Sequence, residues 1–363
     1  MRSVLFRICP WSLALLVAGG AAAQADLDAS PAATARALLR AEMLRSGVPG
    51  LSCAVAVGDE LVFSDGFGLA DVENGVPAGP GTVYRLASIS KPITAVLAMQ
   101  LVERGELDLD ADVADLVAAW PAKRWPVTTR QLLGHLGGVR HYAGEGESTV
   151  PYATQTDGLA RFAADPLLHE PGTAYRYSTY GFNLVAAVIE ARTGRPFAAV
   201  VAERVAAPCA APTLQADDVR RIVPGRAQGY VRRDGVLENS ELMDASYKLG
   251  GGGLCASAED LVRFASALLA GRLVEPDTLA AMWTEQRTTA GDGTGYGLGF
   301  GVRTVGGRRV VSHSGAQPRV STMLYLLPDE RVAVAVLCNL ERVRLGEVAR
   351  RVAFAFADGA AVR

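Results

Sequence analysis

Strand-like segments lie at both ends of this chain, with helical patterns between them. Near the N-terminus, residues 51–57 and 60–65 are rich in apolar and β-branched side chains, and a tight turn at Gly58-Asp59 joins them. Four strand-like runs lie near the C-terminus, at 296–303, 308–313, 320–327 and 331–337. A sheet must bury its apolar faces against other elements. The economical arrangement is an α+β fold with one antiparallel sheet, built from both chain ends and flanked by helices.

The segment between the two groups of strands has the spacing of helices and long loops. Apolar residues recur at helical spacing over 180–192, and Gly194 is a stop signal for that helix. We expect helices at about 31–44 and 342–356 to cover the sheet. These patterns divide the chain into an α/β lobe of about 30–95 and 245–360 and a mostly helical lobe of about 96–244.

Length and charge limit the functions open to this chain. It has 363 residues, half of them hydrophobic, and a formal net charge of −2. This length can build one large domain or two packed lobes with a substantial core. The near-neutral charge gives no electrostatic footprint for a nucleic acid or an anionic membrane, so we expect neither as a partner.

The N-terminal residues have the pattern of a targeting signal. Two arginines in 1–7 precede a mostly apolar run at 8–17, and a stretch of small residues follows at 18–25. The apolar run is too short to span a bilayer comfortably, so a cleaved signal is favoured over an anchor. The sequence therefore predicts a signal peptide over 1–25 and a secreted or periplasmic mature chain of 26–363.

The short motif with the most chemistry is Ser88-Ile89-Ser90-Lys91-Pro92. Proline fits only the first turn of a helix, so a helix begins near Ser88. Residues 93–101 are small or apolar nearly all round, which predicts a buried helix. Ser88 and Lys91 then share one face, with the hydroxyl at the positive helix end and an amine beside it. Both features suit a nucleophile, whereas a helix cap followed by a solvated lysine is the alternative.

Two further motifs carry polar groups next to apolar elements. Tyr177 and Thr179 come directly before the helix predicted at 180–192, and a tyrosine of lowered pKa near a cationic lysine can act as a general base. His313-Ser314-Gly315 ends a strand expected at the centre of the sheet, where Gly315 allows a substrate backbone to approach closely. Each motif alone is also compatible with a packed aromatic or a structural histidine.

The four glycines at 250–253 leave two interpretations open. They can form a tight turn, or they can bring the backbone close to a substrate. The Lys-Ser/Thr pair of a phosphate-binding loop does not follow them, so nucleotide binding is excluded. The histidines at 135, 141 and 169 lack metal-ligand spacing, so we expect no metal and no cofactor.

The three motifs, in this order, resemble those of the β-lactamase/penicillin-binding serine hydrolases, particularly the class C-like branch. Ser-x-x-Lys, a tyrosine motif and a strand ending in His-Ser-Gly follow one another as they do in that family. The likeness runs from about 51 to 340. Further similar stretches are 68–74, 128–133, 141–142, 177–179 and 247–248.

The resemblance implies a role for each matched residue. Ser88 would be the nucleophile, Lys91 its proton partner, and Tyr177 the general base and then the acid. The backbone N–H groups of Ser88 and Ala316 would form the oxyanion hole. Thr179, His313, Ser314 and Gly315 would line the substrate side.

Two departures from the family pattern bear on the substrate. Thr179 stands where class C β-lactamases have asparagine, and His313 stands where they have lysine. A permanent cation that faces the β-lactam carboxylate is therefore missing at this position, which favours a peptide, amide or ester. A small-molecule or peptide substrate is expected, and the alternative is a non-catalytic descendant that binds cell-wall peptides.

The resemblance also concerns the cysteines. Cys53 lies early in the first predicted strand and Cys338 at the end of the last. In the family's sheet these strands are antiparallel neighbours, so Cys53 and Cys338 are the two cysteines expected to lie closest together. A disulfide between them and a pair of buried free thiols both remain open.

Overall fold

A single antiparallel sheet forms the centre of the molecule and contains strands from both ends of the chain. The computed structural model describes residues 30–143 and 149–361, so the predicted signal peptide lies outside the described residues. The seven strands have the order β3-β2-β1-β12-β11-β10-β9. Their bounds are β1 Gly50–Val57, β2 Glu60–Asp71, β3 Val76–Pro77, β9 Gly301–Val305, β10 Arg308–Gln317, β11 Val320–Leu327 and β12 Val332–Cys338. The predicted α+β fold is confirmed.

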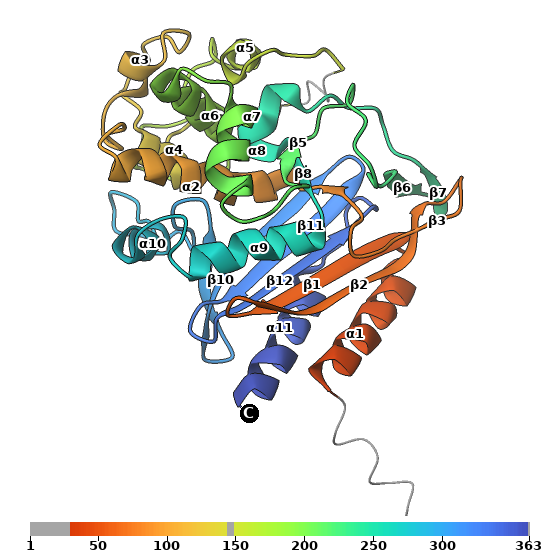
Figure 1. The fold of residues 1–363 in the computed structure, drawn as a ribbon. Helices are drawn as coiled ribbons and strands as arrows, with labels where there is room; N and C mark the ends of the chain where they lie inside the picture. Colours follow the sequence, from red (N-terminus) through yellow and green to blue (C-terminus); the bar gives the residue numbers. More distant parts are fainter. Residues whose placement is uncertain (1–29, 144–148, 362–363) are drawn as a thin grey trace, which may run out of the picture.

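Helices cover both faces of the sheet. Figure 1 shows α1 (Pro31–Ser46) and α11 (Gly346–Ala361) beside each other on one face and α9 (Ala258–Leu269) across the other. Along β12, the valines at alternate positions belong to the core beneath α1 and α11, whereas Ala333 and Ala335 belong to the core on the α9 side. This alternation follows from the two-residue period of a strand, and both faces are apolar because both are covered.

Most of the remaining helices gather at one end of the sheet, above α9 in Figure 1, whereas α10 lies beside α9. Their bounds are α2 Ser90–Glu103, α3 Val113–Leu116, α4 Thr129–Leu133, α5 Gln155–Gly158, α6 Thr179–Thr193, α7 Phe197–Val201, α8 Leu249–Gly252 and α10 Pro276–Met282. The core of this region is α6, which is buried from Thr179 to Ile189. The Ser178 hydroxyl accepts a hydrogen bond from the Gly181 N–H at its start, and Gly194 ends it with a φ of 65°.

Two small sheets accompany the seven-stranded sheet. One has the order β4-β8-β5, from Tyr84–Arg85, Leu254–Ala256 and Gln215–Ala216. The other is the hairpin of β6 (Tyr230–Arg233) and β7 (Val236–Asn239). Its turn is Asp234-Gly235, with φ values of 49° and 83°, as a tight hairpin turn requires.

The structure departs from the sequence prediction in the glycine-rich segments. The strand expected at 296–303 begins only at Gly301, because Gly295 and Gly299 adopt φ values of 66° and 87° that bend the chain. The four-glycine run, for which a tight turn was one prediction, mostly forms the single helical turn α8. Among the described residues, no helix is long and apolar enough to cross a membrane.

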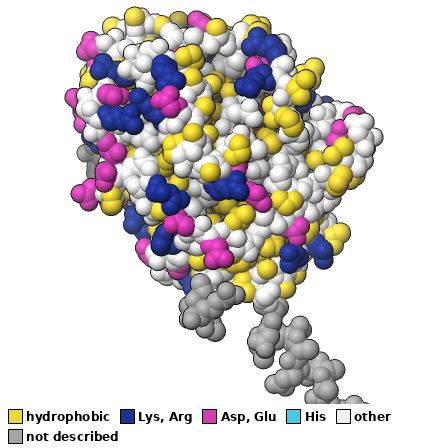
Figure 2. Space-filling view, in the orientation of Figure 1, with side chains coloured by type: hydrophobic (Ala, Val, Ile, Leu, Met, Phe, Trp, Pro, Cys, Tyr) yellow, Lys and Arg dark blue, Asp and Glu magenta, His cyan; other side chains and the backbone are white. Residues whose placement is uncertain are grey.

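The surface carries charges of both signs. On the face shown in Figure 2, basic and acidic side chains alternate with apolar ones, and neither sign forms a continuous field. This distribution agrees with the formal net charge of −2.

Candidate active site

Ser88 lies in a sharp turn at the entrance to a buried helix. It is the middle residue of the short 3₁₀ helix η1 (Ala87–Ile89), which leads directly into α2. Ala87 has a φ of 49°, in the left-handed region that L-residues rarely adopt. The following helix is buried from Ser90 to Leu101, whereas Ser88 itself is half-buried. The turn therefore presents one hydroxyl at the edge of an otherwise closed core.

The Lys91 amino group is a direct hydrogen-bond partner of Ser88. Its Nζ lies 2.9 Å from Ser88 Oγ, 3.2 Å from Thr179 Oγ1 and 2.6 Å from the Gly251 carbonyl oxygen. Burial lowers the pKa of Lys91 well below its usual range, and the charge of Lys248 lowers it further. A neutral amine can donate its two N–H groups to Thr179 and Gly251, and its lone pair then faces the Ser88 hydroxyl. Lys91 is therefore set up to accept the serine proton.

Tyr177 is held in a cluster of aromatic rings. The Lys91 Nζ lies 4.9 Å from the centre of its ring, and the ring of His135 lies 4.3 Å from it. Burial raises the pKa of Tyr177 above its usual value, and a hydrogen bond to Ser88 only partly offsets this. The expectation of a lowered tyrosine pKa is therefore wrong for the free protein, because burial disfavours the phenolate and the neighbouring Tyr175 raises the pKa further.

His313 is buried in β10 and uses both ring nitrogens inside the protein. Its Nδ1 lies 2.7 Å from the Ser314 carbonyl oxygen, which can only accept, so Nδ1 carries the proton. Nε2 then accepts a hydrogen bond from the Tyr296 hydroxyl at 2.9 Å. Burial, with a smaller effect of the Lys91 charge, lowers the pKa of His313 to about 3. A neutral imidazole therefore occupies the position where the resemblance led us to look for a cation.

Two glycines bring separate segments into contact around Ser88. A Cβ on Gly315 would lie 2.4 Å from the Leu86 carbonyl oxygen, so the glycine lets β10 pack against the chain just before the nucleophile. A Cβ on Gly251 would lie 2.5 Å from Thr179 Cγ2. The glycine run thus packs against α6 and directs its Gly251 carbonyl oxygen to Lys91.

The predicted site residues come together around two adjoining hollows. A hollow of about 240 Å³ is lined by Ser88, Tyr177, Thr179, Ser314 and Ala316, among others. A larger hollow of about 700 Å³ shares Tyr177, Ser314 and Ala316 with it and adds His313 and Gly315. Lys91 lies beneath the smaller hollow and bonds to its lining residues. Among the described residues, no cluster of histidine, cysteine or acidic side chains could hold a metal ion.

Two residues near Ser88 and Tyr177, Lys248 and His135, take part in the site although the sequence motifs predicted no role for them there. Lys248 is buried beside the Ser88 hollow and lowers the pKa of Lys91. His135 accepts a hydrogen bond from the Ser178 N–H at 3.2 Å and packs against Tyr177. The position of Lys248 two residues before the glycine run was the available signal, whereas nothing local marks His135 as a neighbour of Tyr177.

Comparison with known proteins agrees with this geometry. Residues 35–357 match the family model described as Beta-lactamase. The chain is 29% identical to the Serine beta-lactamase-like protein LACTB, mitochondrial, from Homo sapiens, over 85% of this chain and 77% of that protein. It is 32% identical to Esterase EstB from Burkholderia gladioli, over 69% of this chain and 74% of that protein.

The fold also matches a solved structure. The octameric penicillin-binding protein homologue from Pyrococcus abyssi superimposes with a TM-score of 0.77 at 25% identity, over 90% of this chain and 77% of that one. With the family model covering most of the chain, this protein belongs to the beta-lactamase family and is a serine hydrolase of that family.

Proposed function

We propose that this protein hydrolyses an ester, amide or peptide through an acyl-enzyme formed on Ser88. The observation that carries the proposal is the 2.9 Å separation between Ser88 Oγ and the Nζ of a fully buried lysine of lowered pKa. Lys91 takes the hydroxyl proton as Oγ attacks the substrate carbonyl carbon. The backbone N–H groups of Ser88 and Ala316 stabilise the oxyanion that develops.

Tyr177 completes the proton path in this proposal. As a neutral phenol with a hydrogen bond to Ser88, it donates a proton to the leaving group and recovers one from the Lys91 ammonium. Collapse of the tetrahedral intermediate leaves the acyl group on Oγ. Water then attacks the ester, its proton passes to the same two side chains, and Ser88 is restored.

An ester is the substrate class that we place first. The neutral His313 offers no charge to a substrate carboxylate, as noted from the sequence. The similarity to Esterase EstB supports an ester. Three arginines, Arg303, Arg342 and Arg344, line the outer part of the larger hollow, and they favour an ester with a negative group away from the scissile bond. We also propose that the protein is exported, because 1–25 has a signal-peptide pattern.

Labelling with a fluorescent fluorophosphonate tests the nucleophile. The wild type should become covalently labelled, and Ser88→Ala should lose the label while its circular dichroism spectrum stays unchanged. Ser64→Ala, in β2, is the matched serine control and should label like the wild type. Labelling of a folded Ser88→Ala protein would refute the assignment, and a folded wild type that never labels would favour the non-catalytic alternative.

A further inference from the structure

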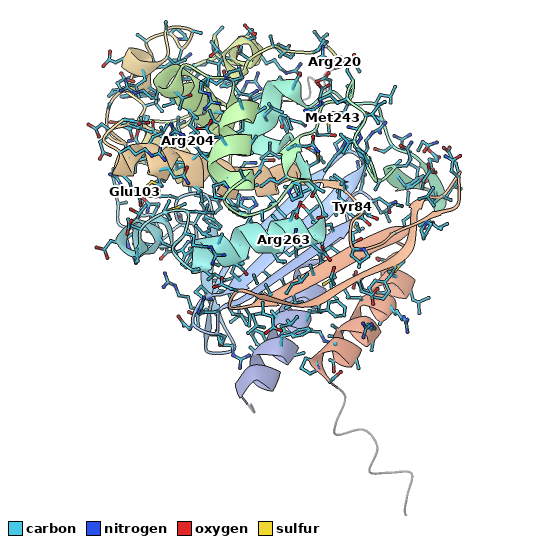
Figure 3. All side chains as sticks on the ribbon, viewed as in Figure 1. Tyr84, Glu103, Arg204, Arg220, Met243 and Arg263 are labelled. Carbon is cyan, nitrogen blue, oxygen red and sulfur yellow. The ribbon has the colours of Figure 1, made fainter. Side chains whose placement is uncertain are left out.

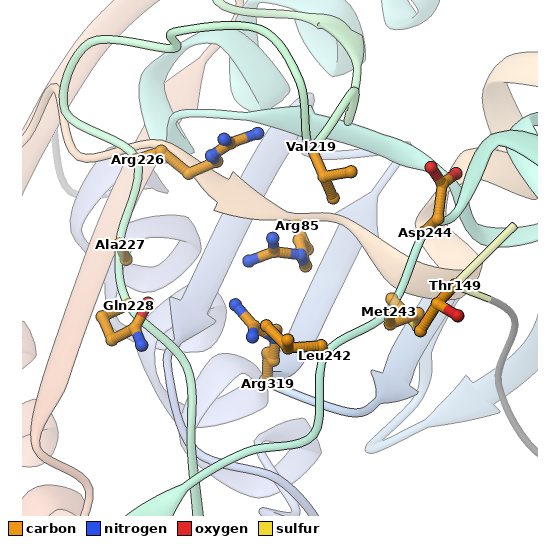
Figure 4. A pocket seen from close by; sticks show the side chains of 10 residues that line it. All are labelled: Arg85, Thr149, Val219, Arg226, Ala227, Gln228, Leu242, Met243, Asp244 and Arg319. Carbon is orange, nitrogen blue, oxygen red and sulfur yellow. The ribbon is translucent and has the colours of Figure 1, made fainter. Parts of the chain in front are cut away.

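A third hollow, which shares no lining residue with the two hollows around Ser88, contains three arginines. Its volume is about 370 Å³. Arg85 ends β4, Arg226 lies in the loop before β6, and Arg319 lies in the turn between β10 and β11. Figure 4 shows the guanidinium groups of these three residues around the space of the pocket, and Figure 3 labels two nearby side chains, Tyr84 and Met243. We call this hollow the arginine pocket.

The three guanidinium groups of the arginine pocket share a single ion-paired carboxylate among the described residues. Asp217 pairs with both Arg85, at 2.7 Å, and Arg226, at 3.1 Å. Arg319 donates from Nε to the Glu241 carbonyl oxygen at 2.8 Å, and no described carboxylate forms an ion pair with its guanidinium group. Asp244 also lines the pocket, with Oδ1 accepting from the Ser246 N–H. Glu341 accepts a hydrogen bond from the Arg319 backbone N–H at 3.1 Å, and its charge also acts on the guanidinium group, but the two form no ion pair. Asp217, which two arginines share, is thus the carboxylate that pairs directly with guanidinium groups of the pocket.

Two of the three arginines are buried. The side chains of Arg85 and Arg319 are only 5% and 9% exposed. Burial lowers the pKa of Arg319, and the neighbouring Arg85 charge lowers it further. A buried cation without a carboxylate partner is costly, and an anion in the pocket would offset that cost.

We propose that the arginine pocket binds a small oxyanion, in the first place a carboxylate with a short aliphatic tail. Guanidinium groups bind carboxylates and phosphates through paired N–H donors, so three of them around one space suit either head group. The aliphatic tail would contact the apolar side chains that line the pocket, which are Val219, Leu242 and Met243. Val219 and Leu242 are exposed and therefore accessible to it. Inorganic phosphate, which has the same head-group chemistry and no tail, is the comparison.

The segments that form the arginine pocket continue into the Ser88 hollow. Arg85 is three residues before Ser88, and Arg319 is two residues after Gln317, which lines that hollow. The two sites are therefore neighbours along the chain but have no lining residue in common. A test must separate an anion bound at the arginine pocket from one bound beside the active site.

Isothermal titration of the full protein with sodium hexanoate, and separately with sodium phosphate, tests the site at constant ionic strength. We expect hexanoate to bind the wild type and to bind more tightly than phosphate. Arg319→Gln should weaken binding about tenfold or more, as expected for loss of hydrogen bonds to a charged group. Arg303→Gln is the matched control, since that arginine lines the larger hollow beside Ser88, and it should keep the wild-type affinity.

Each outcome decides between the alternatives. If Arg303→Gln loses hexanoate binding and Arg319→Gln keeps it, the anion binds in the active-site cleft and the proposal is overturned. The proposal is also overturned if neither salt binds the wild type. If phosphate binds more tightly than hexanoate, the pocket is still an oxyanion site, but the proposed preference for an aliphatic tail is refuted. Arg226→Gln is a second variant with a partly exposed side chain, and it decides the question if Arg319→Gln does not fold.

Discussion

At the scale of single residues, the proton path depends on two side chains whose pKa values move in opposite directions. Burial lowers the pKa of Lys91 and raises that of Tyr177, so the neutral amine is the better base in the free protein. Lys91→Ala and Tyr177→Phe should each slow acylation by roughly two or more orders of magnitude. The measurement is the rate of fluorophosphonate labelling under single-turnover conditions.

The double variant tests whether the two residues act on one proton. When two side chains serve a single proton transfer, removing either one slows the reaction nearly as much as removing both. The rate reduction in the double variant should therefore be far smaller than the product of the two single reductions. If the effects of Lys91→Ala and Tyr177→Phe multiply, the two residues act on separate steps. The shared path would then be excluded.

Lys248 controls the pH range in which Lys91 is neutral. Its positive charge favours loss of the Lys91 proton, so Lys248→Met should raise the pKa of Lys91. The acylation rate increases with the fraction of Lys91 that has lost its proton. In Lys248→Met, the rising limb of the pH–rate profile should therefore move to higher pH. Lys123→Met is the control, because Lys123 donates to backbone carbonyl groups elsewhere and should leave the limb in place. A shift to lower pH in Lys248→Met would contradict this electrostatic coupling.

At the scale of elements, Gly315 sets the distance between β10 and the turn that carries Ser88. A methyl group there would meet the Leu86 carbonyl oxygen at 2.4 Å and Thr322 Oγ1 at 2.1 Å. Because the first of these is backbone, one of the two elements must move. Gly315→Ala should cost about 1–3 kcal/mol in the free energy of unfolding and should also slow labelling of Ser88.

Gly81→Ala provides the comparison for this prediction. A Cβ at Gly81 would meet no atom within 4 Å, and its φ is not positive. Urea titration followed by circular dichroism should therefore give Gly81→Ala the wild-type midpoint and Gly315→Ala a lower one. Equal midpoints for the two variants would show that the packing between β10 and η1 adapts without cost.

The elements also show what sequence patterns can and cannot predict. The strand predicted at 320–327 is β11, because a continuous apolar run bounded by turns suits a strand covered on both faces. By contrast, β10 extends past His313 to Gln317, since backbone pairing with β11 does not require apolar side chains. Spacing indicated Ser88 and Lys91 as partners, but their pKa shifts depend on burial and on Lys248, which lies far away in sequence.

At the scale of the whole molecule, the pairing of β1 with β12 joins the two ends of the described chain. Leu51 lies opposite Cys338, and Cys53 lies opposite Val336, so the two cysteines are diagonal neighbours on one face. Diagonal positions in an antiparallel pair are about 7–8 Å apart, beyond the usual span of a disulfide. Cys53 and Cys338 are free thiols in the structure, which decides against the disulfide and for the two buried thiols.

The four described cysteines should therefore report the unfolding of the whole chain. Cys53, Cys209, Cys255 and Cys338 are all free and buried. Burial raises the pKa of Cys209, Cys255 and Cys338 to about 12, and the thiolate is the form that reacts. In a protein that begins at Asp26, iodoacetamide should label none of them in the native state. All four should react in guanidinium chloride, with a midpoint that coincides with the loss of circular dichroism. Mass spectrometry without reductant is the check, and recovery of a peptide that links Cys53 to Cys338, or labelling of either thiol well before the global transition, would contradict a β1–β12 pairing that opens only when the molecule unfolds.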